Sequence, residues 1–150
     1  MTAIFKAFGD DSIVVGFETK DRFEAIAKAG SLLVQAGQAS HTYSQRMAEA
    51  LHNFGPYMVV VEGVALAHAA PDLDVISTGM SLVSLAQPVD FGGGKMVSLV
   101  FALAAIDHHQ HIDLMGEFAR LFEREGSVNL LLKAGSSAQL RQTMSALLGE

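Results

Sequence analysis

The sequence contains no cysteine, and this absence excludes several kinds of chemistry. Without thiols the chain forms no disulfides, offers no thiolate nucleophile and builds no zinc-thiolate site. It also has no uninterrupted apolar stretch of the roughly 18 residues that a membrane-spanning helix requires, although 50% of its residues are hydrophobic. We therefore expect these apolar residues to fill a folded core, and any nucleophile to be something other than sulfur.

Basic residues are also few. The chain has 10 Lys and Arg against 16 Asp and Glu, which gives a formal net charge of -6, and the cations are scattered without forming a stripe. This distribution argues against a nucleic-acid backbone as a partner. The N-terminal segment MTAIFKAFGDDS carries one lysine, two aspartates and no long apolar stretch. It does not resemble a secretory signal, so we expect a cytoplasmic location.

The rest of the sequence alternates between short β-branched runs and amphipathic segments, without repeats or a linker. One amphipathic helix is expected to end at Gly37, and a second, with Tyr43 on its apolar face, at Gly55. The run 97–105 is apolar on both faces, as expected of a central strand covered by helices on each side. Strands are predicted at residues 12–17, 57–61, 64–67, 75–85 and 97–105. This order predicts one domain over residues 1–150, an α/β fold in which helices flank both faces of a mixed β-sheet as a three-layer sandwich.

The C-terminal third is predicted to be helical. Asp107, followed three residues later by Gln110, has the form of an N-cap with its capping partner, and this helix is expected to run to Gly126. A short helix over residues 127–132 and a last helix beginning after Ser136 should follow. The helix that begins after Asp107 presents backbone N–H groups and a positive dipole end, which together form a ready site for an anion.

The segment GGGK at residues 92–95 is a candidate phosphate-binding loop. A P-loop requires Ser or Thr directly after its lysine, whereas this position is Met96. We therefore expect residues 92–95 to form a hairpin or a loop.

Histidines are the remaining candidates for nucleophilic or metal chemistry. His41 and His52 lie near the two ends of a predicted surface helix, where histidine is usually a solvated polar residue. His108 and His111 lie three residues apart on one helix, a spacing that suits a metal ion, although two imidazoles alone make a weak site. The six histidines are His41, His52, His68, His108, His109 and His111.

His68 differs from the others by its position at the end of an apolar strand. Small residues and Pro71 follow it, so its ring should emerge at the strand terminus with room above it. In isolation such a histidine is more often a structural residue of a core or a turn. If the strand end faces the helix that begins at Asp107, however, a phosphoryl group on His68 would meet the helix dipole and the imidazole of His111.

Two long segments carry a resemblance to a known family. They are FGPYMVVVEGVALAHAAPDLDVISTGMSLVSLAQPVDFGG at residues 54–93 and VSLVFALAAIDHHQHIDLMGEFARLF at residues 97–122. Together they are similar to the type-2 enzyme IIA domain of the bacterial sugar phosphotransferase system, the family of the mannitol and fructose components. The G-x-A-L-x-H pattern and the preceding G-P-Y most resemble its ascorbate-specific branch.

The resemblance implies a phosphotransferase that needs no cofactor and no metal and that takes part in the uptake of a sugar or of ascorbate. In that family a histidine accepts a phosphoryl group from the histidine phosphocarrier protein and passes it to a cysteine of enzyme IIB. The membrane component, enzyme IIC, is reached only indirectly. The accepting histidine matches His68, which would carry the group as a tele-phosphohistidine, and the second family histidine matches His111, which would stabilise it.

Two positions depart from the family pattern. The proline that precedes the accepting histidine is Ala67 here, which removes a fixed φ angle without removing a reactive group. The mannitol and fructose branches also use an arginine in the helix before these strands. Ala50 falls near that position and Arg46 lies one turn earlier, so no arginine is assigned a role.

Two other functions fit the same residues. One is a regulatory module in which phosphorylation of His68 controls binding to a target, without transport. The other is a metal-dependent hydrolase, which would use His108, His111 and Asp107 together with the same histidine. For the carrier itself, we expect an apolar docking patch around His68 that includes Phe91.

Overall fold

The computed structural model describes residues 2–149, and its centre is a five-stranded mixed sheet. The strands are β1 (Phe8–Phe17), β2 (Val59–Val61), β3 (Gly63–His68), β4 (Gly79–Asp90) and β5 (Met96–Ala104). The helices are α1 (Ala3–Ala7), α2 (Arg22–Gln35), α3 (His41–Phe54), α4 (His108–Leu121), α5 (Ser127–Leu132) and α6 (Ser137–Leu147), with a 3-10 turn η1 (Gly55–Met58) after α3. Within residues 2–149 no helix is both long and apolar enough to cross a bilayer.

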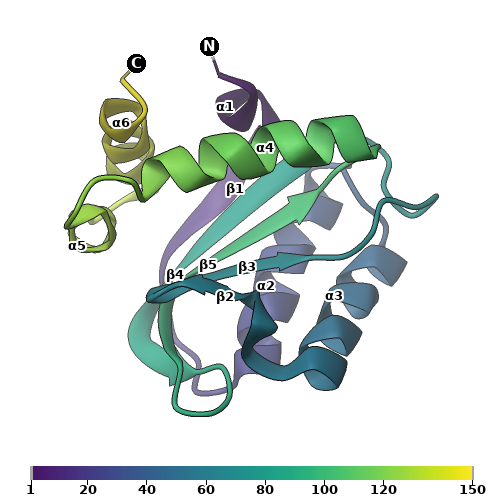
Figure 1. The fold of residues 1–150 in the computed structure, drawn as a ribbon, viewed down its shortest axis with the longest axis horizontal. Helices are drawn as coiled ribbons and strands as arrows, with labels where there is room; N and C mark the ends of the chain where they lie inside the picture. The colour runs from purple at the N-terminus through teal and green to yellow at the C-terminus, as the bar shows by residue number, and fades with distance from the viewer. Residues whose placement is uncertain (1, 150) are drawn as a thin grey trace.

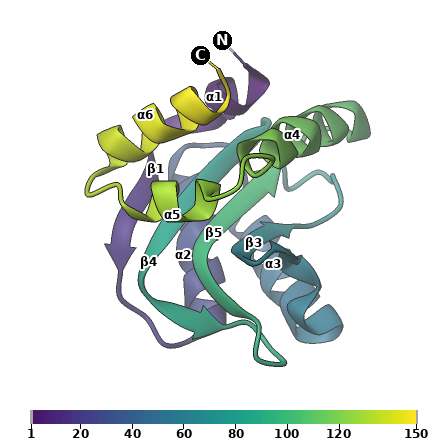
Figure 2. The same cartoon turned by 60° about the vertical axis from the view of Figure 1, so that its left-hand side comes forward.

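The sheet has the strand order β1-β4-β5-β3-β2, and helices cover both of its faces (Figures 1 and 2). α2 and α3 pack on one face, whereas α4 crosses the other face with α1, α5 and α6 nearby. β3 shows the division: Ala65 and Ala67 belong to the core under α2 and α3, while Val64 and Leu66 belong to the core under α4. A strand buried on both faces is apolar at nearly every position, as β3 is. The predicted three-layer α/β architecture is confirmed.

Three strands and one helix meet at one end of the sheet. β3 runs parallel to β5 and ends at His68 opposite Leu103, near the end of β5. β4 runs antiparallel to β5, so Leu103 also faces Met80, near the start of β4. Residues 105–107 connect β5 directly to α4. The topology therefore brings the end of β3, which carries His68, to the same end of the sheet as the first turn of α4 (Figure 1).

The opposite end of the sheet holds the tight connection between β4 and β5. Its three consecutive glycines adopt positive φ angles, which cost glycine little because it has no Cβ. Asp90 Oδ1 accepts hydrogen bonds from the amides of Gly92 and Gly94, at 2.8 and 3.2 Å. These amides are bonded within the loop itself, and the predicted hairpin at residues 92–95 is confirmed.

β4 begins later than predicted. The amides of Ile76 and Ser77 donate to the carbonyl oxygen of Gln38, at 2.8 and 3.1 Å, in the connection between α2 and α3. The segment 75–78 is therefore bonded to a loop and not to β5, and the regular strand starts at Gly79. The apolar sequence of this segment does not indicate whether it pairs with β5 or with the loop at Gln38.

Two further boundaries differ from the prediction. β1 starts at Phe8, earlier than expected, and the short helix α1 precedes it. α4 ends at Leu121, before the predicted Gly126. The carboxylate of Glu117 accepts hydrogen bonds from the first two amides of α1, at 3.2 and 3.3 Å. Because these groups are 114 and 113 residues apart in the chain, local sequence patterns do not reveal the contact that supports α1.

Candidate functional site

His68 closes β3 at the end of the sheet where α4 begins, with its side chain half-buried. Its Nδ1 lies 3.0 Å from the carbonyl oxygen of Leu66. With the ring hydrogen on Nδ1, the imidazole donates to this carbonyl, and the lone pair of Nε2 is left free. A neutral histidine held in this tautomer offers Nε2 as a nucleophile.

The imidazole of His111 lies beside that of His68, in the first turn of α4. The two ring centroids are 5.5 Å apart, and the ring planes are inclined by 59°. Burial lowers the pKa of His111, and the nearby imidazoles of His68 and His108 lower it further, because each of these effects disfavours a positive charge on the ring. His111 is therefore neutral at neutral pH and keeps one N–H group to donate. The structure brings together the two histidines that the sequence analysis singled out.

The first turn of α4 is held by two side chains. Asp107 Oδ1 accepts a hydrogen bond from the amide of Gln110 at 2.8 Å, so the predicted N-cap is confirmed. The side chain of Gln110 makes a different contact from the predicted one, because its Oε1 accepts from the hydroxyl of Thr78. That hydroxyl in turn accepts from the amide of Ile106, at 3.1 Å. Thr78 thus ties the start of α4 to the segment that leads into β4.

The loop after His68, residues 69–78, is bonded to α3 by Arg46. Its guanidinium donates to both carboxylate oxygens of Asp74, at 2.8 and 2.7 Å, and also to the carbonyl oxygen of Ala70, at 2.8 Å. The bond to Arg46 lowers the pKa of Asp74, and the same bond raises the pKa of Arg46. This bidentate pair fixes the loop against the helix in a geometry that a lysine could not reproduce.

A second tie between α3 and this region is the hydroxyl of Tyr43, which bonds to the main chain beside His68. Sequence reasoning missed both ties, since Tyr43 was expected only on an apolar helix face and Arg46 had no assigned role. A tyrosine on an apolar face is a usable signal, because a buried phenol requires a hydrogen-bond partner. The identity of that partner depends on the tertiary fold.

Exposed apolar side chains occur on the elements that flank His68. Phe54 and Tyr57 are exposed by 68% and 75%, and together with His68 and Ala69 they line a hollow of about 260 Å³. Large apolar side chains exposed next to a site are typical of a surface that contacts another protein. Further exposed apolar residues on the neighbouring loop and at the start of α4 are Leu73, Ile76, Ile106 and Ile112.

Phe91 lies elsewhere. It follows β4 at the opposite end of the sheet, where it is fully buried in the core under α2 and α3. Side chains alternate between the faces along a strand, and Phe91 points inward after the exposed Asp90. The prediction that Phe91 belongs to a docking patch around His68 is wrong.

The remaining histidines do not build a metal site. His109 lies 3.4 Å from Asp113 on the exposed surface of α4, and His41 and His52 are exposed on α3. Among residues 2–149 no three His, Asp or Glu side chains are grouped so that they could hold a metal ion. The geometry therefore gives no support to the metal-dependent hydrolase.

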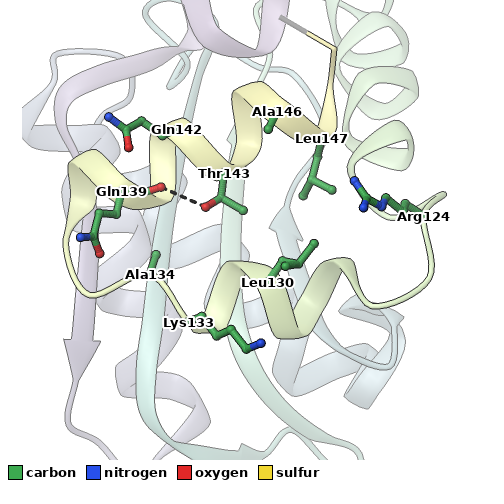
Figure 3. Close-up of a pocket in the computed structure, with 9 residues that line it drawn as sticks. All are labelled: Arg124, Leu130, Lys133, Ala134, Gln139, Gln142, Thr143, Ala146 and Leu147. Atoms are coloured by element: carbon green, nitrogen blue, oxygen red, sulfur yellow. Dashed lines mark hydrogen bonds between the residues drawn. The ribbon is translucent and has the colours of Figure 1, made fainter.

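A separate groove lies between α5 and α6, at the far end of α4 from His111 (Figure 3). Its volume is about 560 Å³, and its only charged lining residues are Arg124 and Lys133. Neither a histidine nor a carboxylate lines it. The groove therefore lacks the pair of imidazoles that lies at the start of α4, where His68 and His111 are side by side.

Comparisons with known proteins identify relatives of this chain. A family model described as "Phosphoenolpyruvate-dependent sugar phosphotransferase system, EIIA 2" matches residues 6–146. The mannitol-specific cryptic phosphotransferase enzyme IIA component of Escherichia coli K12 is 34% identical over 139 residues, covering 92% of this chain and 95% of that protein. A solution structure of the Escherichia coli protein of this name is similar with a TM-score of 0.87 at 33% identity, covering 95% and 98% of the two chains.

Two further proteins extend the comparison. The ascorbate-specific EIIA component of Escherichia coli K12 is 33% identical over 124 residues, with 80% of each chain covered. The mannitol enzyme IIA of Escherichia coli, solved as a complex with phosphorylated enzyme IIB, is similar in fold, with a TM-score of 0.81 at 23% identity, covering 93% of this chain and 99% of that one. Mannitol-specific and ascorbate-specific relatives thus match this chain at nearly the same identity.

Proposed function

The chain belongs to the EIIA type 2 family of the phosphoenolpyruvate-dependent sugar phosphotransferase system, and on this premise we propose that His68 is its phosphoryl acceptor. In this proposal His111 stabilises the phosphoryl group without bonding to it covalently. The observation that carries the proposal is the approach of the two imidazoles, with centroids 5.5 Å apart, at the start of α4.

The proposed step is an in-line transfer between two imidazoles. Nε2 of neutral His68 attacks the phosphorus of a phosphohistidine on the donor, whose second ring nitrogen carries a hydrogen. The new N–P bond forms as the donor N–P bond breaks, and the donor leaves as a neutral imidazole. No proton needs to move, because the hydrogen stays on Nδ1 of His68, where it is hydrogen-bonded to the carbonyl oxygen of Leu66.

The surroundings of His68 suit the charge that this step creates. The transition state of phosphoryl transfer is loose, and its negative charge spreads over the equatorial oxygens. The imidazole of His111 lies next to that of His68, and both are at the N-terminal end of α4, so in this proposal an N–H group of His111 and the helix dipole stabilise those oxygens. Donors fixed in place before the reaction stabilise such charge without a cost of reorganisation.

We propose the histidine phosphocarrier protein as the donor and a cysteine of enzyme IIB as the acceptor, with enzyme IIC reached only through enzyme IIB. The mannitol enzyme IIA of Escherichia coli forms a complex with phosphorylated enzyme IIB, and this chain has the same fold. Donor and acceptor must reach the same nitrogen in turn. Exposed apolar side chains such as Phe54 and Tyr57 suit brief contacts with both partners.

The test is incubation with phosphoenolpyruvate, enzyme I and the histidine phosphocarrier protein. We expect one phosphoryl group per chain, in a bond that is labile in acid and stable in base. His68→Ala should take no label, and labelling of this variant at the wild-type rate would overturn the proposal. Addition of enzyme IIB should then discharge the label to a cysteine, whereas a label that stays on His68 would favour the regulatory module.

A further inference from the structure

We infer that Tyr43 is a positioning residue of this site, whose hydroxyl holds the backbone that carries His68 in the orientation needed for transfer. The inference rests on the proposed function of His68 and adds to it a residue on a different element, α3.

The hydroxyl of Tyr43 forms hydrogen bonds with the main chain at two points next to His68, one on β5 and one directly after β3. It donates to the carbonyl oxygen of Leu103 at 2.5 Å and accepts from the amide of Ala69 at 3.0 Å. Ala69 directly follows His68 in the chain, and Leu103 faces His68 across the β3–β5 ladder. One oxygen atom thus joins the residue after the histidine to the residue opposite it.

This tie lies where the regular sheet ends. His68 is the last residue of β3 that pairs with β5, so the ladder does not hold the chain beyond it. The hydroxyl of Tyr43 extends the bonding by one residue, to Ala69. Arg46, one turn further along α3, holds Ala70 in the same way through its carbonyl. Two consecutive residues after His68 are therefore bonded to one face of α3.

The surroundings of Tyr43 keep this bond closed to water. The side chain is 1% exposed, and burial raises the pKa of its hydroxyl to about 12. The phenol therefore keeps its hydrogen at every pH at which the protein is expected to work. Without the oxygen, a buried carbonyl and an amide would lose their partner, and the chain around them would have to move to satisfy them. In-line transfer is sensitive to such movement, because reacting atoms must be held within a narrow range of distance and angle.

The experiment compares Tyr43→Phe, which removes only the oxygen, with Ser81→Ala as a matched control. Ser81 is also fully buried, and its hydroxyl also donates to a main-chain carbonyl, that of Ala29, at 2.7 Å. Single-turnover transfer from the phosphorylated phosphocarrier protein is measured at increasing donor concentration. For Tyr43→Phe we expect the saturating rate to fall about tenfold, with the half-saturating concentration changed by less than twofold. Ser81→Ala should keep both values.

Nitrogen-15 NMR of the histidine side chains gives a readout that does not depend on transfer. In the wild type we expect His68 to hold its hydrogen on Nδ1, and in Tyr43→Phe we expect a mixture of the two tautomers together with faster hydrogen exchange at the amide of Ala69. Ala69→Pro removes the donor of the same tie from the main-chain side. It should lower the saturating rate in the same way, and it replaces Tyr43→Phe if that variant does not fold.

The two proposals fail in different ways. A wild-type protein that takes no label overturns the role of His68 but leaves the NMR test of Tyr43 intact. A Tyr43→Phe variant with the wild-type saturating rate and an unchanged His68 tautomer overturns the inference about Tyr43 alone. An equal loss of rate in Tyr43→Phe and Ser81→Ala would also overturn the inference about Tyr43, because it would reflect general destabilisation.

Discussion

At the scale of single residues, His111 combines a lowered pKa with a place beside His68 in the first turn of α4. Losing one hydrogen bond to a charged group costs on the order of 1.5–3 kcal/mol, which corresponds to roughly tenfold or more in rate. We therefore expect His111→Ala to slow the labelling of His68 by at least about tenfold, measured as the initial rate with the phosphocarrier protein as donor.

The neighbouring histidines of α4 provide the controls for this prediction. His108 and His109 are exposed, and His109 contacts Asp113 across 3.4 Å at the surface. Replacing either residue by alanine should change the labelling rate little. Equal losses at all three positions would contradict the role of His111 as a specific donor.

The lowered pKa of His111 also predicts a dependence of stability on pH. In the unfolded chain the imidazole binds a proton at about pH 6.5, whereas in the folded protein it does so only at lower pH. The unfolded state therefore binds more protons between these values, so the contribution of His111 is complete above about pH 6.5 and is lost as the pH falls through the folded pKa. The free energy of unfolding, measured by urea titration, should fall less between pH 7.5 and pH 5.5 in His111→Gln than in the wild type. An identical fall in both proteins would contradict the prediction.

Ala67 is the residue at which this chain departs from the family pattern next to His68. β2 pairs with β3 only as far as Ala65, so beyond that point β3 has a neighbouring strand on one side alone. The ladder with β5 still places Ala67 opposite Ala102, so the prediction requires that the amide of residue 67 points to the open edge of β3, where proline is tolerated. We expect Ala67→Pro to raise the free energy of unfolding by about 0.4–1 kcal/mol and to keep the labelling rate equal or higher. The test compares the unfolding midpoints and labelling rates of Ala67→Pro and the wild type. A clearly less stable variant would mean that the amide of residue 67 is hydrogen-bonded.

At the scale of elements, the loop 69–78 is held to α3 by the pair of Arg46 and Asp74. Asp74→Asn removes the charge while it keeps the shape of the side chain. We expect it to lower the free energy of unfolding by about 1 kcal/mol, since the pair is bidentate and only partly exposed. Thermal and urea unfolding at pH 7 measure the effect.

The matched control for this change is Asp72→Asn in the same loop. Asp72 is exposed, its carboxylate accepts a hydrogen bond from the amide of Leu73, and its effect on Arg46 is smaller than that of Asp74, so its loss of charge should have a much smaller effect. The difference between the two variants should also vanish in acid, because Arg46 lowers the pKa of Asp74. The stabilisation by the folded pair is present above about pH 3.9, the usual value for aspartate, and is lost as the pH falls through the folded pKa.

Sequence patterns predicted the elements wherever a local period or cap determines them. The cap at Ser136 begins α6 as expected, with the amide of Gln139 bonded to its hydroxyl at 3.2 Å, and α2 and α3 end near the predicted glycines. The predictions failed where a distant partner decides. The segment 75–78 bonds to Gln38 instead of extending β4, and α1 depends on Glu117 for its first amides.

At the scale of the whole molecule, the three-layer architecture followed from runs that are apolar on both faces, because only a sheet covered on each side can bury them. The candidate site was predictable as a pair, His68 and His111, from a strand end, a helix start and a resemblance. Its supports, Tyr43 and Arg46, were not. Their partners are main-chain atoms and a loop carboxylate that only the folded topology brings to α3.

The tautomer of His68 has a consequence for the flow of phosphoryl groups through the protein. Under the proposed function, the hydrogen bond between Nδ1 and the carbonyl of Leu66 leaves Nε2 for both loading and unloading, so donor and acceptor would exclude each other. Turnover should therefore follow ping-pong kinetics, and free acceptor in excess should compete with the donor for the empty carrier. Steady-state flux, measured against increasing enzyme IIB at fixed phosphocarrier protein, should rise, pass through a maximum and decline. A carrier with a single reactive nitrogen should therefore give its highest flux when the concentrations of donor and acceptor are balanced.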